Sequence, residues 1–180
     1  MTRRTTAHLF SSLNGVVEAP DQFQFDAFGA VEGEVMAASL AEVTEVVIGR
    51  KLWQEWREYW QDKDDDFGVF INPVRKHVLS STLEADPGWN STVVDGDVVD
   101  YVTALRSEGE GTISVVGGVD TIRSLFLAGL IDALTLTIHP AVTPVGRRLF
   151  DEDVPLTRLR LVDSRISDVG NALLTYALRD

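Results

Sequence analysis

Residues 113–129 of the chain read ISVVGGVDTIRSLFLAG, and this stretch sets the expected fold. A β-branched apolar run stops at Gly117 and Gly118, and apolar residues then recur with the spacing of an α-helix. The sequence therefore predicts a strand, a tight turn and a helix in direct succession. Because glycine weakens the ends of both elements, the pair implies that a neighbouring group excludes side chains from the turn.

The composition limits the kinds of protein this can be. A chain of 180 residues suffices for a packed core, and we assign residues 1–180 to a single domain. The formal net charge of −12 argues against a nucleic-acid partner, because phosphate backbones bind basic surfaces. The sequence contains no membrane-length apolar run, no signal-peptide pattern and no cysteine, so we expect a cytoplasmic protein without a membrane partner.

Strands and helices alternate along most of the sequence. The patterns predict strands at residues 6–17, 44–49, 75–81, 90–96, 113–116, 132–142, 158–166 and 171–179. They predict helices at residues 27–43, 50–60, 98–106 and 119–130, with an acidic loop at 62–66. Such alternation is typical of an α/β fold with three layers, in which helices cover both faces of a mainly parallel sheet. The last two strands alternate polar and apolar residues, which is typical of antiparallel pairing.

Three junctions after predicted strands have the chemistry of an anion site. Ligands of open parallel sheets bind beyond the carboxyl ends of the strands. The junctions are Gly49 with Arg50 and Lys51, the hydroxyls of Ser80 and Ser81, and the glycine pair with its helix. Backbone N–H groups at a helix start attract phosphate, and a missing Cβ lets it approach.

Each junction also has a plainer interpretation. Arg50 and Lys51 could be solvated bases, and the serines could be ordinary loop residues. The glycines could serve only a tight turn that needs a positive φ, with Asp120 and Thr121 only capping the helix. Three junctions together favour a phosphate-bearing ligand more than any one of them does.

Metal sites and hydrolase sites are not indicated. Residues 62–73 imitate a calcium loop through their aspartates, but Phe67 and Pro73 occupy the positions of its glycine and glutamate. His8, His77 and His139 lack the spacing of metal ligands, and we interpret them as strand residues. No bound metal is expected.

Aromatic residues and one carboxylate are candidates for a substrate pocket. Trp56 and Trp60 belong to an aromatic ladder in the helix at 50–60, which forms either core or one wall of a pocket for a flat ring. Asp26 lies between Phe25 and Phe28. If buried, Asp26 would hold a proton that it could donate to a substrate; if exposed, it is an ordinary loop residue.

The order of these junctions resembles the dihydrofolate reductase superfamily, especially its branch related to the C-terminal reductase domain of the riboflavin-biosynthesis protein RibD. SLNGVV at residues 12–17 is similar to the S-L-D-G segment of the family, and IGRKLW at 48–53 to its G-R-x-T-W segment. HVLSS at 77–81 resembles a strand whose serines reach the adenosine phosphate. The run from VVGG at 115–118 to RRLF at 147–150 is the most specific match, and the resemblance covers nearly the whole chain.

The resemblance implies NADPH as the cofactor. In the family the glycine turn and the helix start receive the pyrophosphate, which corresponds here to Gly117, Gly118, Val119, Asp120, Thr121 and Ile122. Gly49, Arg50, Lys51, Ser80 and Ser81 would hold the adenosine 2′-phosphate and its neighbours. The nicotinamide would lie near Ser12, Asn14 and Val17.

The resemblance also implies a dihydrofolate reductase-like fold and a reductase of a small pteridine- or pyrimidine-like ring. The family reaction is reduction of 5-amino-6-(5-phosphoribosylamino)uracil, with the proton coming from Asp26 or an ordered water. His8 stands where riboflavin reductases carry Lys, Asn14 where they carry Asp, and residues 18–28 lack their phosphosugar-binding segment. Two alternatives remain: a non-catalytic NADP-binding module, and a structural homodimer formed through residues 132–142 on an exposed sheet edge or face.

Overall fold

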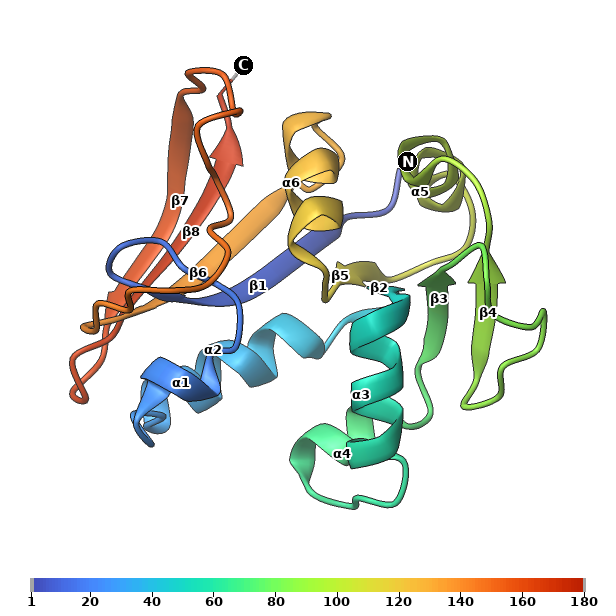
Figure 1. Ribbon diagram of the computed structural model, residues 1–180, viewed down its shortest axis with the longest axis horizontal. Helices are drawn as coiled ribbons and strands as arrows, with labels where there is room; N and C mark the ends of the chain where they lie inside the picture. Colours follow the sequence, from blue (N-terminus) through green and yellow to red (C-terminus); the bar gives the residue numbers. More distant parts are fainter. Residues whose placement is uncertain (1, 180) are drawn as a thin grey trace.

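The computed structural model describes residues 2–179, which build one eight-stranded sheet with helices on both faces (Figure 1). The strands are β1 (Thr5–Ser12), β2 (Val43–Gly49), β3 (Arg75–Leu79), β4 (Ser91–Val94), β5 (Thr112–Val115), β6 (Ala133–His139), β7 (Leu159–Ile166) and β8 (Ala172–Leu178). The helices are α1 (Asp21–Gln24), α2 (Ala30–Leu40), α3 (Arg50–Trp60), α4 (Asp66–Ile71), α5 (Val98–Arg106) and α6 (Val119–Leu127).

The sheet order is β4-β3-β2-β5-β1-β6-β8-β7. Pairing is parallel from β4 to β6 and antiparallel between β6, β8 and β7, which confirms the mainly parallel sheet with antiparallel C-terminal strands. Because the parallel strands end at one edge, the turns after β1, β2, β3 and β5 gather there. This edge, which we call the carboxyl edge, therefore carries all three junctions that the sequence singles out.

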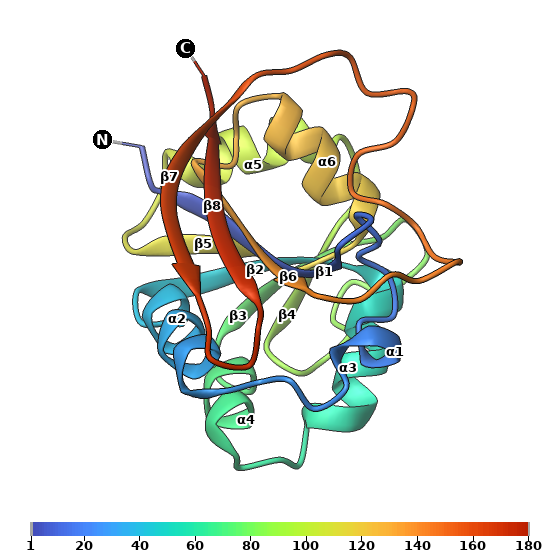
Figure 2. The same cartoon turned by 90° about the vertical axis from the view of Figure 1, so that its left-hand side faces the viewer.

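Helices lie on both faces of the sheet (Figures 1 and 2). Side-chain alternation along the strands divides the apolar residues between two cores, one on each face. Val47 of β2 faces the layer of α5 and α6, where Ile122 and Phe126 are fully buried. Val46 and Ile48 of the same strand face α3 and α4, and pack with the core members Trp53 and Ile71. Each face of the sheet is thus covered by helices, as expected for three layers.

Several boundaries differ from the sequence-based expectation, each for a local reason. The first strand ends at Ser12 instead of residue 17, because the Ser12 hydroxyl accepts a hydrogen bond from the Val16 N–H across a turn at Gly15 (φ +86°). Helix α2 starts at residue 30 instead of 27, because the Glu32 carboxylate accepts the Gly29 N–H. Helices α1 and α4 are not predicted by the sequence patterns, since both are shorter than two full turns.

The outermost strands of the sheet are β4 and β7, and β6 lies inside the sheet between β1 and β8. Of the two predicted dimer contacts at residues 132–142, the one through an exposed edge is wrong, because both sides of β6 are already hydrogen-bonded within the sheet. The contact through a face of the sheet stays a prediction. Strand β7 is the exposed outermost strand next to β8.

Between residues 2 and 179, no helix combines the length and the apolar character needed to cross a bilayer.

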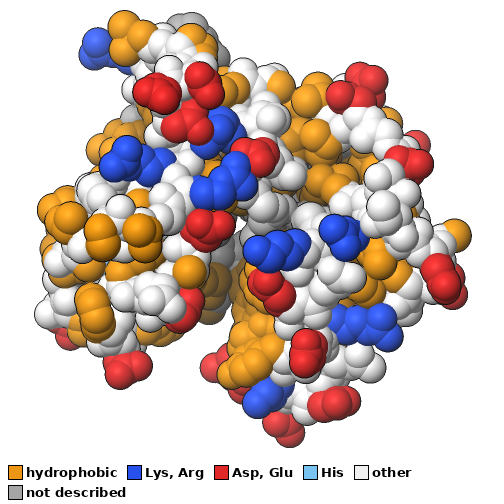
Figure 3. All heavy atoms as spheres, in the orientation of Figure 1, with side chains coloured by type: hydrophobic (Ala, Val, Ile, Leu, Met, Phe, Trp, Pro, Cys, Tyr) orange, Lys and Arg blue, Asp and Glu red, His pale blue; other side chains and the backbone are white. Residues whose placement is uncertain are grey.

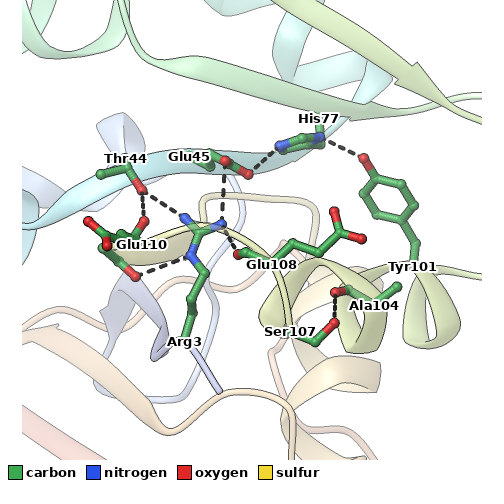
Figure 4. A network of polar contacts seen from close by, with 10 residues as sticks. Arg3, Thr44, Glu45, His77, Tyr101, Ala104, Ser107, Glu108 and Glu110 are labelled. Carbon is green, nitrogen blue, oxygen red and sulfur yellow. Dashed lines mark hydrogen bonds and ion pairs between the residues drawn. The ribbon is translucent and has the colours of Figure 1, made fainter. Parts of the chain in front are cut away.

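A partly buried polar network lies at the amino ends of the strands, opposite the carboxyl edge (Figure 4). The Arg3 guanidinium donates to Thr44 Oγ1 at 2.7 Å and to two backbone carbonyls, and lies 3.4 Å from Glu45 Oε1. Glu45 Oε2 lies 2.8 Å from His77 Nε2, and the Tyr101 hydroxyl lies 2.7 Å from His77 Nδ1. Burial lowers the pKa of His77, and Glu45 opposes part of that shift. We call these five residues the amino-edge network.

Candidate functional site

The glycine turn brings the starts of two helices together at the carboxyl edge. The Gly49 N–H donates to the Gly117 carbonyl at 3.1 Å, so the residue before α3 touches the residue pair before α6. Gly49 and Gly118 are the N-caps of these helices, and neither has a side chain that could satisfy the first N–H groups. Two helix N-termini with free N–H groups thus face the same region, which favours an anion there.

The two glycines of the turn have different surroundings. A Cβ on Gly117 would overlap the Leu52 side chain of α3, so its neighbour is protein. A Cβ on Gly118 would have no heavy atom within 4 Å, and Gly118 is exposed. The space beside Gly118 is therefore open, and a group from outside the chain could approach the bare backbone there.

Cations surround this turn. Arg50 and Lys51 are exposed at the start of α3, where a positive charge opposes the helix dipole unless an anion is present. Arg147, from the loop after β6, pairs with the Asp120 carboxylate in the first turn of α6. Arg123 of α6 pairs with Asp151 at 2.7 Å. The sequence patterns did not reveal Arg147, because it lies 27 residues from its partner.

The serine junction lines a groove of about 410 Å³ at the ends of β3 and β4. Ser80 Oγ accepts hydrogen bonds from the N–H groups of Thr82 and Leu83, both at 3.1 Å, so this hydroxyl shapes the loop. Ser81 is exposed beside it. The groove has a carboxylate side as well, where Asp97 caps α5 by accepting the N–H groups of Val99 and Asp100.

The residues predicted near the nicotinamide hold the turn after β1. Ser12 is buried and donates to Asn14 Oδ1 at 2.8 Å. Asn14 Nδ2 donates to the Thr143 carbonyl at 2.9 Å, while Asn14 Oδ1 also accepts the Thr143 N–H. An aspartate at position 14 would lack the donor, so the amide explains how this chain ties the turn to the loop after β6. Val17 is buried in the same turn.

The loop that carries Asp26 is exposed. Asp26 has a left-handed backbone (φ +59°) and an exposed side chain, so it matches the alternative in which it is an ordinary loop residue. Phe25 is 77% exposed and Phe28 49% exposed, with the Phe28 ring edge-on to Phe10. The two phenylalanines are thus available to a ligand, and the carboxylate lacks the burial that a proton donor would need.

A hollow separates the part of the molecule that carries α1 from the part that carries α3 (Figure 3), and Trp56 and Trp60 belong to α3. Both are half-buried and pack edge-on against Phe67 of α4, with ring centroids 5.3 and 4.9 Å apart. Part of each ring therefore belongs to the core, as one of the two sequence interpretations proposed. The remaining surface of each ring is open to solvent.

On the face of the sheet that Phe23 of α1 covers, β1 and β6 present polar side chains. Thr137 and His139 of β6 are 0% and 1% exposed, and His8 Nε2 is hydrogen-bonded to Thr137 Oγ1 at 2.8 Å. Burial lowers the pKa of His8 to about 4. Burial also lowers the pKa of His139, although the nearby Glu32 carboxylate acts in the opposite direction. Both imidazoles are therefore neutral near pH 7.

Glu32 is the buried carboxylate that the sequence did not single out. Its Oε1 accepts Asn171 Nδ2 at 2.8 Å and its Oε2 accepts the Gly29 N–H at 2.9 Å. Burial alone would raise the pKa of Glu32, but hydrogen bonds from Ser167, Asn171 and the backbone lower it below the usual value. The carboxylate is thus ionised and held in place. Its position three residues after Gly29, where it completes a capping box, was the available sequence signal.

Comparison with known proteins gives a consistent family and fold. The RibD C-terminal domain family matches residues 3–174. YyaP of Bacillus subtilis (strain 168), which is uncharacterized, is 22% identical over 185 residues, spanning 97% of this chain and 94% of YyaP.

Solved structures confirm the dihydrofolate reductase-like fold. A structure from Shewanella sp. PV-4, provisionally assigned to riboflavin biosynthesis, superimposes with a TM-score of 0.77 at 21% identity over 100% of both chains. Dihydrofolate reductase from Enterococcus faecalis, complexed with NADP(H), superimposes with a TM-score of 0.63 at 15% identity over 100% of both chains. The match therefore extends to the arrangement of strands that places the glycine turn at the carboxyl edge.

Proposed function

Since the chain belongs to the RibD C-terminal domain family, we propose that it is an NADPH-dependent reductase of a small pteridine- or pyrimidine-like ring. The family and the fold are those of reductases, and an NADP(H) complex exists for the E. faecalis relative in fold. The choice of NADPH and of this substrate class is the proposal.

The observation that carries the proposal is the open space beside Gly118. A nucleotide pyrophosphate can rest on main chain only where no Cβ intervenes, and position 118 leaves that room. Val119, Asp120 and Thr121 contribute free N–H groups from the first turn of α6, and Ile122 anchors the helix in the core.

The 2′-phosphate side of the cofactor is assigned to the neighbouring junctions. Arg50 and Lys51 supply positive charge next to Gly49, and Ser81 offers a hydroxyl at the groove after β3. These cations compensate locally for the net charge of −12, which otherwise repels an anionic ligand. Ser12, Asn14 and Val17 shape the turn on which the nicotinamide end would lie.

We assign the substrate ring to the space between the loop at 25–28 and α3, where the exposed Phe25 and Phe28 and the half-buried Trp56 and Trp60 are the proposed contacts. NADPH, when bound, supplies the hydride for the reduction. The residues of this chain orient the two rings and exclude water. The exposure of Asp26 favours an ordered water over this carboxylate as the proton source.

Reduction of 5-amino-6-(5-phosphoribosylamino)uracil is the specific reaction that the family suggests. His8, in place of the family lysine, removes a cation from the first strand. Comparing the rate of NADPH oxidation with this substrate and with a simple dihydropteridine therefore decides between the specific reaction and the broader substrate class.

Gly118→Val tests the assignment of the cofactor site. The extended backbone of Gly118 (φ −76°, ψ −179°) accommodates valine, so the fold should persist while NADPH binding, followed by quenching of tryptophan fluorescence, falls at least 100-fold. Gly33→Val is the matched control, because a Cβ at position 33 also meets nothing within 4 Å but lies on α2. Equal NADPH affinity of Gly118→Val and wild type would overturn the assignment.

A non-catalytic NADP-binding module is the second candidate, and the exposure of Asp26 is the observation that favours it. Both candidates bind NADPH, but only the reductase oxidises it when a pteridine or pyrimidine substrate is added. Absence of quenching at millimolar NADPH would reject both. A homodimer also remains a prediction, to be tested by analytical ultracentrifugation.

A further inference from the structure

The loop after β6 brings Arg147 against the turn after β1. The Val17 N–H donates to the Arg147 carbonyl at 2.9 Å, and the Arg147 N–H donates to Glu18 Oε2 at 3.2 Å. Gly146 allows this close approach, because its φ is +118° and a Cβ there would overlap the Val16 side chain. The main chain of Arg147 is therefore fixed beside the turn that we assign to the nicotinamide end of the cofactor.

The Arg147 side chain reaches a different turn. Strands β1 and β5 are parallel neighbours in the sheet, so the turns that follow them lie next to each other at the carboxyl edge. From its place beside the first of these turns, the guanidinium reaches Asp120, in the first turn of α6 and two residues after Gly118. Arg147 thus joins the places that we assign to the nicotinamide and to the pyrophosphate, and a dinucleotide that occupied both would pass it.

Asp120 places a negative charge where the pyrophosphate is expected. Its carboxylate lies in the first turn of α6, where the helix dipole favours an anion. It pairs with Arg147, and Arg123 Nη1 lies 3.8 Å from Asp120 Oδ1. A helix start and two guanidinium groups therefore converge on one carboxylate of the chain itself, close to the open space beside Gly118.

The two arginines differ in how firmly they are held. The Arg123 side chain is 17% exposed, pairs with Asp151 at 2.7 Å and donates to two backbone carbonyls. Within residues 2–179, the polar contacts of the Arg147 side chain are with Asp120 alone, and these two side chains are 49% and 67% exposed. Exposed ion pairs add little to stability. Arg147 can therefore exchange Asp120 for another anion at small cost.

We propose that Arg147 binds the pyrophosphate of the cofactor, and that Asp120 holds the guanidinium in the free protein as an internal substitute for that anion. This inference rests on the proposed function, since it adds a residue to the same cofactor site. On binding, the guanidinium leaves the carboxylate and donates to phosphate oxygens, which accept two parallel hydrogen bonds from it. The N–H and the side chain of Asp120 then act in opposite directions: the N–H attracts the pyrophosphate, and the carboxylate competes with it.

The two members of this ion pair should therefore affect NADPH affinity with opposite signs. Arg147→Gln removes the guanidinium, and we expect at least a 10-fold loss of NADPH affinity, measured by quenching of tryptophan fluorescence. Asp120→Asn removes the competing carboxylate, and we expect at least a 3-fold gain. If the pair only stabilised the loop and the helix start, both variants would weaken binding. That result, or unchanged affinity in either variant, would overturn the inference.

Two control variants remove the same charges elsewhere. Asp66 is the exposed acidic residue in the first turn of α4, which packs on the opposite face of the sheet from α6, so Asp66→Asn should leave NADPH affinity unchanged. Arg158 is exposed at the far end of the loop that carries Arg147, directly before β7, and Arg158→Gln should also have no effect. A control effect as large as that of the matched variant would contradict the inference, because net charge would then explain the affinities.

The double variant tests whether Asp120 acts through Arg147. In the Arg147→Gln background, Asp120→Asn should give a smaller gain in affinity than in wild type, because there is no guanidinium left to compete for. An equal gain in both backgrounds would show that the carboxylate only repels the ligand, and would refute the exchange of partners. Melting temperatures should stay close to that of wild type, because the pair is exposed. A lower melting temperature of Arg147→Gln with unchanged affinity would assign Arg147 a structural role instead.

Inorganic pyrophosphate, titrated by calorimetry, separates this inference from the proposed function. If wild type binds pyrophosphate but not NADPH, and the two variants change pyrophosphate affinity in opposite directions, the proposed function fails and the exchange of anions at Arg147 stands. If NADPH binds but the variants do not change its affinity in opposite directions, the proposed function stands and the inference fails. No binding of either ligand at millimolar concentration would overturn both.

Discussion

The amino-edge network and the cluster of His8, His139 and Asn171 both contain buried polar side chains on the same sheet, but they differ in hydrogen bonding. At the amino edge, Arg3 donates to three acceptors and lies beside Glu45, and both ring nitrogens of His77 are paired (Figure 4). In the cluster, His139 has no partner for either ring nitrogen. Burial and residue type alone do not distinguish the two.

Whether the polar atoms have hydrogen-bond partners indicates what the network and the cluster can each do. A fully paired network has no free donor or acceptor for a ligand, so its contribution is to stability and to fixing the ends of the strands. An unpaired cluster is a cost to the free protein that a ligand can remove on binding. The two histidine environments therefore predict opposite responses to substitution, and the following experiments test this contrast.

The largest effect is expected from Arg3→Met. Removing this guanidinium leaves the half-buried Glu45 carboxylate without its cation and two backbone carbonyls without a donor, so we expect a loss of about 3–5 kcal/mol in the free energy of unfolding in urea. NADPH affinity of the folded fraction should not change. Arg4→Met, at the exposed neighbouring position, is the control and should leave stability within about 0.5 kcal/mol. An equal loss of stability in Arg3→Met and Arg4→Met would show that the hydrogen bonds of Arg3 do not stabilise the fold.

Acid should destabilise the protein through the buried histidines. The folded pKa of His8, about 4, lies below its unfolded value of 6.5, so the unfolded state binds more protons between these values. Stability is therefore complete above pH 6.5 and falls as the pH drops toward 4, by about 3 kcal/mol for His8. Urea titrations from pH 7.5 to 4 should show a shallower decline for His8→Phe. An identical pH dependence would exclude His8 as the cause.

Arg50→Ala should act on the cofactor and not on the fold. If Arg50 contacts the 2′-phosphate, its loss should reduce the preference for NADPH over NADH by about 1–3 kcal/mol, because a charge-assisted hydrogen bond disappears. The ratio of the two dissociation constants, from fluorescence quenching, measures this. Arg160→Ala, on the exposed edge strand β7, serves as the control. An unchanged ratio of the two dissociation constants would show that the 2′-phosphate does not bind at Arg50.

The smallest effect is expected from Arg165→Ala. Arg165 lies 3.4 Å from Glu34, and the two side chains are 51% and 71% exposed. Exposed ion pairs contribute about 0.2–1 kcal/mol, so the urea midpoint should barely change. The small loss of stability should disappear in high salt, which screens the pair. A loss as large as that of Arg3→Met would show that burial and full pairing do not explain the amino-edge network.

Much of the fold follows from local sequence patterns. The glycine pair at 117–118 predicts the turn before α6, and Asp97 caps α5 as expected, because both effects act over a few residues. The antiparallel C-terminal strands also follow from alternation. The short helices α1 and α4 do not, since helices of four and six residues depend on packing more than on propensity.

The candidate site divides in the same way. By itself, the sequence determined where anion-binding backbone could occur, because a missing Cβ and a helix start are local properties of residues 49–51 and 117–122. Only the tertiary structure decided that Gly117 faces Leu52 while Gly118 faces open space. It also decided that the alternating Thr137 and His139 are buried beside Asn171 instead of facing solvent. Pairing, burial and open space depend on residues far apart in the chain, and no local pattern contains that information.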